Sequence, residues 1–175
     1  MRVFGQVRAL MRRRVALMAA AAVLGVGVAA CTPPPPPPPP SAPSSATPAS
    51  PTLQQIWSLT NHDRGANGLG GLGYNGQLAA LAQDWANHLA ATQSLVHRDL
   101  GSVISQPAYA SFWTLGENLL DGPSSLTPQA METAWMNSPL HRANILSGNF
   151  NVMGAGLAFS PDGRVWVVVN FGGTH

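Results

Sequence analysis

The chain has 175 residues, with nine arginines, no lysine, seven acidic residues and one cysteine. A single cysteine excludes an intrachain disulfide. Five of the arginines precede Cys31, so the rest of the chain carries four arginines against seven acids. The sequence after Cys31 therefore has no cluster of basic residues of the kind that binds nucleic acid or anionic lipid headgroups. We expect no nucleic-acid partner.

The first 30 residues have the features of a secretory signal peptide. Basic residues stand at positions 2, 8 and 12–14, and an apolar run of 16 residues follows at 15–30. The run is shorter than the roughly 20 apolar residues that cross a bilayer. Small residues before Cys31 resemble the lipobox of bacterial lipoproteins, which implies cleavage before Cys31 and acylation of that residue, for example with palmitate. A plain signal peptide with an incidental cysteine, or an uncleaved anchor, are the alternatives.

Residues 31–52 form a proline-rich linker in this interpretation. Eight prolines occupy 33–40, and Ser, Ala, Thr and further Pro continue to Pro51. Such a segment has too little apolar surface to form a core and favours polyproline II, in which eight residues span roughly 25 Å. We expect a spacer that holds an extracytoplasmic domain off the membrane, the alternative being a ligand for a proline-binding module. Residues 53–175 fit one domain.

The first half of that domain has helical periodicity. Residues 53–64 predict a helix, and five glycines between positions 65 and 73 predict a loop. Apolar residues from Leu78 to Leu89 recur at helical spacing after a possible cap at Asn75, and this helix-like segment extends to His97. Thr-Pro at 127–128 and Ser-Pro at 138–139 predict the starts of two short helices.

The last third favours strands. Residues 152–159 and 165–171 are apolar and flank a Pro-Asp-Gly turn at 161–163, which predicts an antiparallel hairpin. A third strand is expected over 114–120. Helices that cover a small antiparallel sheet make an α+β layered domain.

Three side chains carry possible chemistry: His97, Glu117 within Gly116-Glu-Asn118, and His141. Imidazole and carboxylate groups hold zinc or exchange protons near neutral pH. If the fold brings these residues together they form a polar or metal-binding cleft, and otherwise each is an ordinary cap or packed residue. The chain has no Gly-x-Ser-x-Gly or His-Glu-x-x-His motif.

The order of these motifs resembles the CAP superfamily of cysteine-rich secretory, antigen 5 and pathogenesis-related 1 proteins, in its short bacterial form. The segments that carry the resemblance are Asn61-His-Asp-Arg64, His97, Gly116-Glu-Asn118, the run from Trp135 to Leu146, and Gly154-Ala-Gly156. The resemblance implies a three-layer α-β-α sandwich whose cleft holds two histidines and two acids.

By position, the resemblance implies that His97 and His141 are the histidines, which bind a divalent metal such as zinc, and that Glu117 is the first acid. The second acid of the family falls on Ser138, so one carboxylate is absent. Glu132 precedes Trp135 by three residues and is expected to point elsewhere, which weakens a two-carboxylate acid–base mechanism.

Three functions follow as hypotheses. The first is a membrane-tethered, non-enzymatic module that binds a lipid, a cell-wall component or a protein. The second is a metal-dependent hydrolase of peptide or ester bonds, with zinc on His97 and His141 and Glu117 as the base. The third is a structural envelope protein. The absent carboxylate at Ser138 favours the first.

The remaining motif residues are expected to be structural. Arg64 should be buried against a carboxylate or carbonyl oxygens, and Asn118 and Asn144 should bond loop backbone. The tryptophans expected in the core are Trp57, Trp85, Trp135 and Trp166.

Overall fold

The computed structural model describes residues 47–175. The signal peptide expected at 1–30, Cys31 and most of the proline-rich linker lie outside the described residues. Among residues 47–175, no helix has both the length and the apolar character that crossing a membrane requires.

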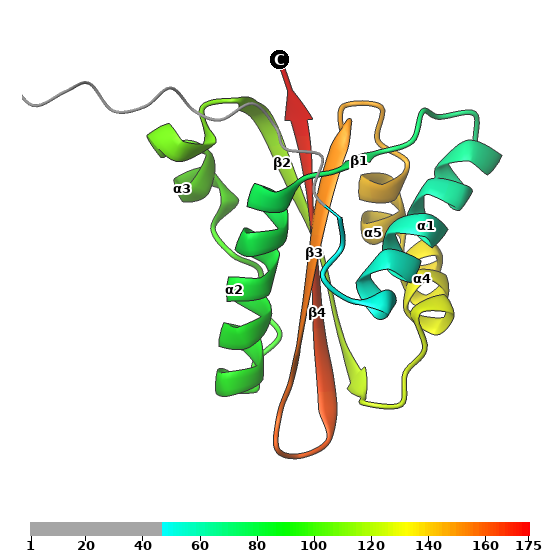
Figure 1. Ribbon diagram of the computed structural model, residues 1–175, viewed down its shortest axis with the longest axis vertical. Coiled ribbons are helices and arrows are strands. Elements are labelled where there is room, and N and C mark those ends of the chain that lie inside the picture. The colour runs from blue at the N-terminus through cyan, green and yellow to red at the C-terminus, as the bar shows by residue number, and fades with distance from the viewer. Residues whose placement is uncertain (1–46) are drawn as a thin grey trace, which may run out of the picture. The chain divides into compact units, whose positions relative to one another are not determined.

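The described residues form a sheet between two helical layers (Figure 1), which confirms the α-β-α architecture. The sheet has the strand order β1-β3-β4-β2, with bounds β1 (Gly73–Tyr74), β2 (Phe112–Pro123), β3 (Val152–Phe159) and β4 (Arg164–Thr174). The β3–β4 hairpin and the β2–β4 pair are antiparallel as expected. The two-residue β1 pairs in parallel with β3, so the sheet is mixed rather than wholly antiparallel.

Local capping explains where the helices begin. In α1 (Pro51–Ala66) the Ser50 hydroxyl accepts the Leu53 N–H, and in α4 (Pro128–Asn137) Thr127 caps in the same way. The helix α5 (Pro139–Ile145) begins after Ser138, whose hydroxyl makes no capping bond, so its Ser-Pro start depends on the proline alone.

The helix α2 (Gly76–Thr92) is capped by Asn75, whose side chain accepts the Leu78 N–H. It packs directly on β3 because Gly154 and Gly156 have no side chains. A β carbon on Gly156 would lie 2.3 Å from the backbone nitrogen of Gln83. The Gly-Ala-Gly motif therefore sets the distance between α2 and the sheet.

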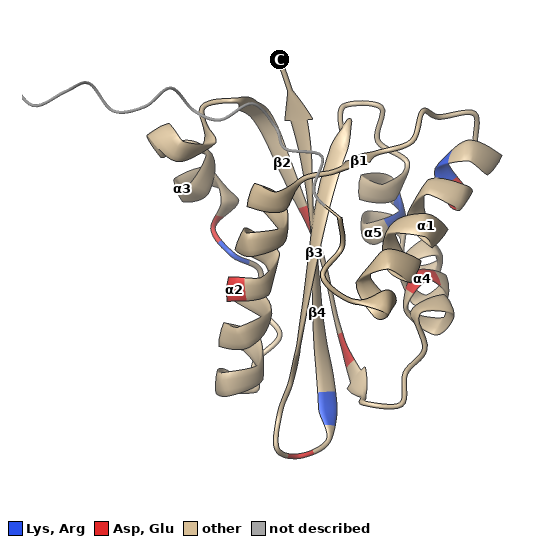
Figure 2. Ribbon diagram, in the orientation of Figure 1, with Lys and Arg blue, Asp and Glu red and all other residues tan. Residues whose placement is uncertain are grey.

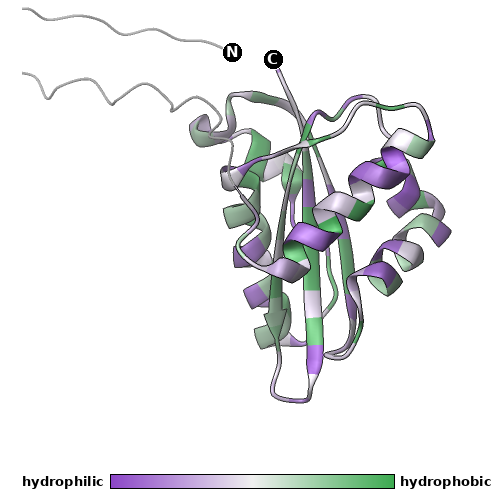
Figure 3. Ribbon diagram, turned by 45° about the vertical axis from the view of Figure 1, so that its right-hand side comes forward, coloured by the Kyte–Doolittle hydropathy of each residue, from purple (hydrophilic) through white to green (hydrophobic). Residues whose placement is uncertain are grey.

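The strand β4 is buried on both faces, which accounts for its continuous apolar run. Val167 and Phe171 join the cluster beneath α1, α4 and α5, whereas Trp166 and Val168 join the cluster beneath α2. The hydropathy colouring shows hydrophobic residues in green along the strands of the sheet (Figure 3).

Arg64 is only 3% exposed and donates hydrogen bonds to backbone carbonyl oxygens, as expected. The four carbonyls belong to Gly70, Ile145, Ser147 and Phe150. This arginine therefore joins α1 to the end of α5 and to the segment that leads into β3.

Some details differ from the sequence expectations. Trp135 and Trp166 lie in the core, but Trp57 and Trp85 are only half-buried at its edge. The structure also contains three short elements that were not expected: β1, the helix α3 (Leu100–Ile104) and the 3-10 turn η1 (Pro107–Tyr109). Figure 2 shows the charged residues of the described part spread over both layers, without a concentration of one sign.

Candidate functional site

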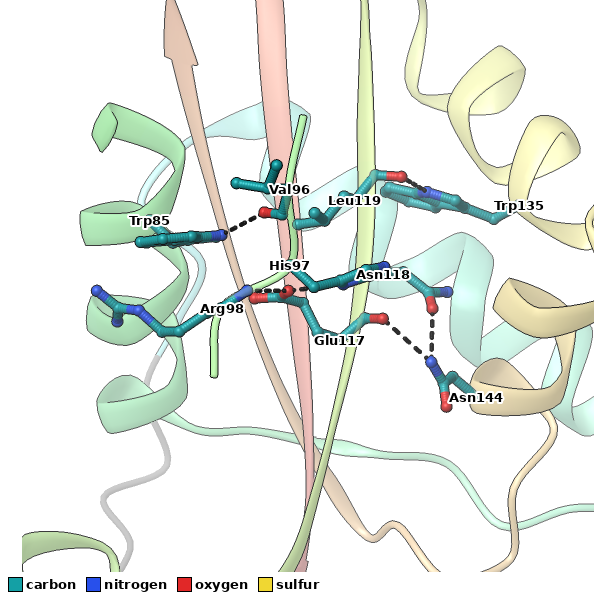
Figure 4. Close-up of polar contacts among 9 residues, drawn as sticks. All are labelled: Trp85, Val96, His97, Arg98, Glu117, Asn118, Leu119, Trp135 and Asn144. Atoms are coloured by element: carbon teal, nitrogen blue, oxygen red, sulfur yellow. Dashed lines mark hydrogen bonds and ion pairs between the residues drawn. The ribbon is translucent and has the colours of Figure 1, made fainter. Parts of the chain in front are cut away.

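The fold brings His97 and Glu117 into direct contact (Figure 4). The Nδ1 atom of His97 lies 2.8 Å from Oε1 of Glu117, and the backbone N–H of Arg98 donates to the same oxygen at 3.1 Å. The His97 side chain is 61% exposed, whereas that of Glu117 is 2% exposed. A buried carboxylate thus holds a solvent-facing imidazole.

Strand alternation explains the Gly-Glu-Asn motif on β2. Glu117 points toward the α2 side of the sheet, and its neighbours point to the other side. There Asn118 donates to the backbone oxygen of His141, and a β carbon on Gly116 would lie 2.7 Å from the Phe150 ring. The motif therefore links the loop that carries His97 to the helix that carries His141.

Asn144 completes that link from α5. Its side-chain amide donates to the backbone oxygen of Glu117 at 3.1 Å and to Oδ1 of Asn118 at 2.9 Å. Asn118 and Asn144 bond backbone as expected, but the backbone is that of α5 and β2 rather than of a loop. Trp135 of α4 adds a bond from Nε1 to the Leu119 oxygen at 3.0 Å, so α4 and α5 are both fixed to β2 (Figure 4).

His97 does not belong to a helix. The helix α2 ends at Thr92, and Gln93 takes a left-handed conformation with φ of 51° that turns the chain into residues 93–99, which we name the His97 loop. The prediction of a helix-like segment up to His97 is therefore wrong. The left-handed turn lies at a glutamine rather than a glycine, so local residue preferences did not indicate it.

Two residues fix the His97 loop to α2. The indole Nε1 of Trp85 donates to the Val96 oxygen at 3.0 Å. The Arg98 guanidinium lies 4.8 Å from the Trp85 ring centroid and forms an ion pair with Asp84. Trp85 was expected in the core and Arg98 had no expected role, because the contacts that orient these side chains come from a loop rather than from periodic structure.

Burial is the main influence on the electrostatics of Glu117. It raises the pKa of the Glu117 carboxyl, and hydrogen bonds from His97 and from the Arg98 N–H oppose that rise. Oε1 takes both bonds, and Oε2 is buried without a hydrogen-bond partner among the described residues. With the carboxylate ionised, Nδ1 of His97 donates its proton to Oε1.

Asn170 is the direct cross-strand neighbour of Glu117 in the ladder. It is fully buried, and neither its amide nitrogen nor its oxygen has a partner within residues 47–175. Directly opposed residues of an antiparallel pair share a face of the sheet. Asn170 therefore faces the α2 side beside Glu117, and its place in a run of valines is the one sequence signal that it differs from core residues.

His141 lies on α5, on the other side of β2. Burial, and then the positive charge of the nearby His97, lower the pKa of the His141 imidazole. The two histidines are thus near enough to interact electrostatically, but no hydrogen bond joins their side chains to each other in the described part of the chain. The fold brings together the predicted pair His97 and Glu117 and places His141 across the edge strand from them.

The donor set does not fit a zinc site with three protein ligands. Within residues 47–175, no three His, Cys, Asp or Glu side chains are arranged to hold a metal ion. Catalytic zinc sites use three protein ligands and a water. His97 and His141 offer two imidazoles, and Glu117 has one oxygen engaged by His97 and Arg98 and the other buried.

The second acid of the expected set is absent from the site. Ser138 ends α4 and precedes α5. Glu132 is 1% exposed and accepts the Thr60 hydroxyl at 3.0 Å, so it points into the interface between α4 and α1, as expected. The described residues therefore bring no second carboxylate to His97.

Comparison with known proteins agrees with the family that the motif order resembles. The family model described as CAP, cysteine-rich secretory protein family, matches residues 57–171. The uncharacterized protein YkwD of Bacillus subtilis (strain 168) is 43% identical over 56 residues, which cover 32% of this chain and 20% of that protein. The chain thus spans about a fifth of the length of this curated relative.

Solved structures share the fold. An outer surface protein from Borrelia burgdorferi aligns with a TM-score of 0.62 and 22% identity, over 71% of this chain and 93% of that one. An extracellular protein containing a SCP domain from Bacillus anthracis str. Ames aligns with a TM-score of 0.58 and 26% identity. That alignment covers 72% of this chain and 44% of the other.

Proposed function

This chain belongs to the cysteine-rich secretory protein family, CAP, and from that premise we propose that it is an extracytoplasmic, membrane-tethered module that binds the cell wall. Cys31 is its acylated anchor, and the prolines that follow are its spacer. The names of the two similar solved structures, an outer surface protein and an extracellular protein, support this location.

One observation carries the choice of binding over catalysis: Glu117 is engaged in holding the His97 loop. Its Oε1 accepts from His97 and from the Arg98 backbone, and its side chain is 2% exposed. A general base must reach the proton that it removes, and a buried carboxylate with this geometry reaches only its own loop. Glu117 therefore acts as a positioning residue.

A second carboxylate is also absent from the site among residues 47–175. The position of the family's second carboxylate is Ser138, and Glu132 faces Thr60 in the helix interface. Without a second carboxylate, and with two imidazoles as the available metal donors, the geometry gives the hydrolase hypothesis no complete catalytic set.

The test of binding uses the mature chain carrying Cys31→Ala, which removes the lipid. We expect this protein to sediment with purified cell-wall sacculi in a saturable manner and to stay in the supernatant with liposomes. Sedimentation with liposomes alone would indicate that the ligand is a lipid and not the cell wall. Failure to sediment with sacculi at millimolar protein would overturn the proposal.

The membrane tether is tested separately in cells. We expect the unaltered chain to appear in the membrane fraction and to incorporate labelled palmitate. We expect the Cys31→Ala variant to stay out of the membrane fraction and to incorporate no palmitate. Equal membrane association of the two proteins would contradict anchoring through Cys31.

A further inference from the structure

A pocket of about 470 Å³ adjoins the His97 loop on the side away from His141. Its walls come from α2, the His97 loop, α3 and η1, which lie together on one face of the sheet (Figure 1). The volume falls within the roughly 300–1,000 Å³ of small-molecule sites. Arg98 joins the two places, since its side chain lines the pocket and its backbone N–H holds Glu117.

The floor of the pocket is apolar and buried. Leu81 of α2 and Val103 of α3 are each 6% exposed and belong to one core cluster. The ring of Tyr109 packs beside Phe112, with centroids 6.3 Å apart, and Trp85 forms another wall. Apolar walls of this kind suit the C–H faces of a ring-shaped ligand.

The rim offers neutral hydrogen-bonding groups. No described residue bonds the Tyr109 hydroxyl, and the only bond of the Gln106 side chain is a long one of 3.4 Å from Nε2 to the Ser102 oxygen. Both side chains therefore have capacity for a ligand. An acyl chain in this pocket would bond neither group, so the rim favours a ligand that has hydrogen-bonding groups of its own.

The positive charge at the pocket is already paired, and the remaining charge is negative. Arg98 forms its ion pair with Asp84, and Asp99 accepts the backbone N–H and the hydroxyl of Ser102. An anionic ligand would lose its hydration, find no free positive charge and meet the Asp99 carboxylate. The walls and rim together favour an uncharged, hydroxyl-rich and ring-shaped ligand.

We propose that this α2–α3 pocket binds an uncharged oligosaccharide segment of the cell wall. The apolar floor receives the sugar rings, while Tyr109 and Gln106 bond their hydroxyl or amide groups. The inference rests on the proposed cell-wall function and assigns its ligand class.

The experiment titrates the mature Cys31→Ala protein with the probe triacetylchitotriose and follows tryptophan fluorescence, since Trp85 lines the pocket. We expect saturable binding that Tyr109→Phe and Gln106→Ala each weaken about threefold to tenfold, the loss of one hydrogen bond. Gln55→Ala, at an exposed glutamine of α1, is the matched control and should leave the affinity unchanged. Laurate and glucuronate should not compete.

Absence of saturable binding at millimolar probe, or binding that neither variant weakens in proteins of unaltered melting temperature, overturns the inference. Competition by laurate or glucuronate would also overturn it, in favour of a lipid or an acidic ligand. If the Tyr109→Phe, Gln106→Ala double variant still sediments with sacculi like the parent, this inference fails while the proposed function stands. If the parent itself does not sediment, the proposed function fails.

Discussion

Glu132→Gln is the substitution with the most quantifiable effect. The Glu132 carboxyl lies between α4 and α1, 1% exposed, with Oε2 bonded by Thr60 and Oε1 without a partner among the described residues. Burial raises its pKa from 4.5 to about 7, the Thr60 bond opposes the rise, and the nearby Asp63 adds to it. Glutamine keeps the shape and the acceptor but does not titrate.

The sign follows from proton linkage. The folded state binds this proton more tightly than the unfolded chain, so the stabilisation is complete below pH 4.5 and is lost as pH rises through about 7. At about 1.4 kcal/mol per pKa unit, the difference is worth about 3 kcal/mol. Above pH 7 the variant should therefore be more stable than the parent by about 3 kcal/mol, and near pH 4.5 the two should be similar.

Urea unfolding of both proteins at pH 4.5 and at about pH 8.5 measures this. The difference in unfolding free energy between the two proteins cancels the contribution of the other titrating groups. Asp162→Asn, which changes an exposed acid in the β3–β4 turn, serves as the control. A parent–variant difference that stays constant between the two pH values would refute the reasoning that Glu132 is buried in the helix interface.

Other substitutions test the fold and the site. Glu117→Ala should cost about 1–3 kcal/mol and speed tryptic cleavage in the His97 loop, because two donors lose their acceptor; equal cleavage rates would contradict this. Gly156→Ala should cost about 3 kcal/mol or more, since its β carbon would meet the backbone of α2, whereas Gly65→Ala, with open space around it, should gain about 0.5–1 kcal/mol. Equimolar zinc should shift the melting temperature by less than about 1 °C; a larger shift that His141→Ala abolishes would contradict the two-imidazole limit.

The sequence predicted the elements whose signals are local. Asn75, Thr127 and the turn at 161–163 mark element ends through bonds within a few residues, and the structure confirms the helices and the hairpin there. The two-residue β1 has no periodicity of its own, and its pairing with β3 depends on residues far along the chain. The short α3 and η1 do have local start signals, the Asp99 cap and Pro107, but five and three residues are too few to show a hydrophobic period.

The site was predictable in composition but not in geometry. The motif order identified His97 and Glu117, and the structure places them 2.8 Å apart. Glu117 is buried, lies beside Asn170 and accepts a bond from Arg98. These properties depend on which face of β2 each residue occupies and on the path of the His97 loop. Neither the face nor the path follows from spacing in the chain.

The central claim is that Glu117 holds the His97 loop for binding and does not serve catalysis. Its most direct test is mass spectrometry of sacculi after prolonged incubation with the mature Cys31→Ala protein. The claim predicts that the protein stays bound and releases no fragments above a blank. Release of fragments that His97→Ala or Glu117→Gln abolishes would contradict it.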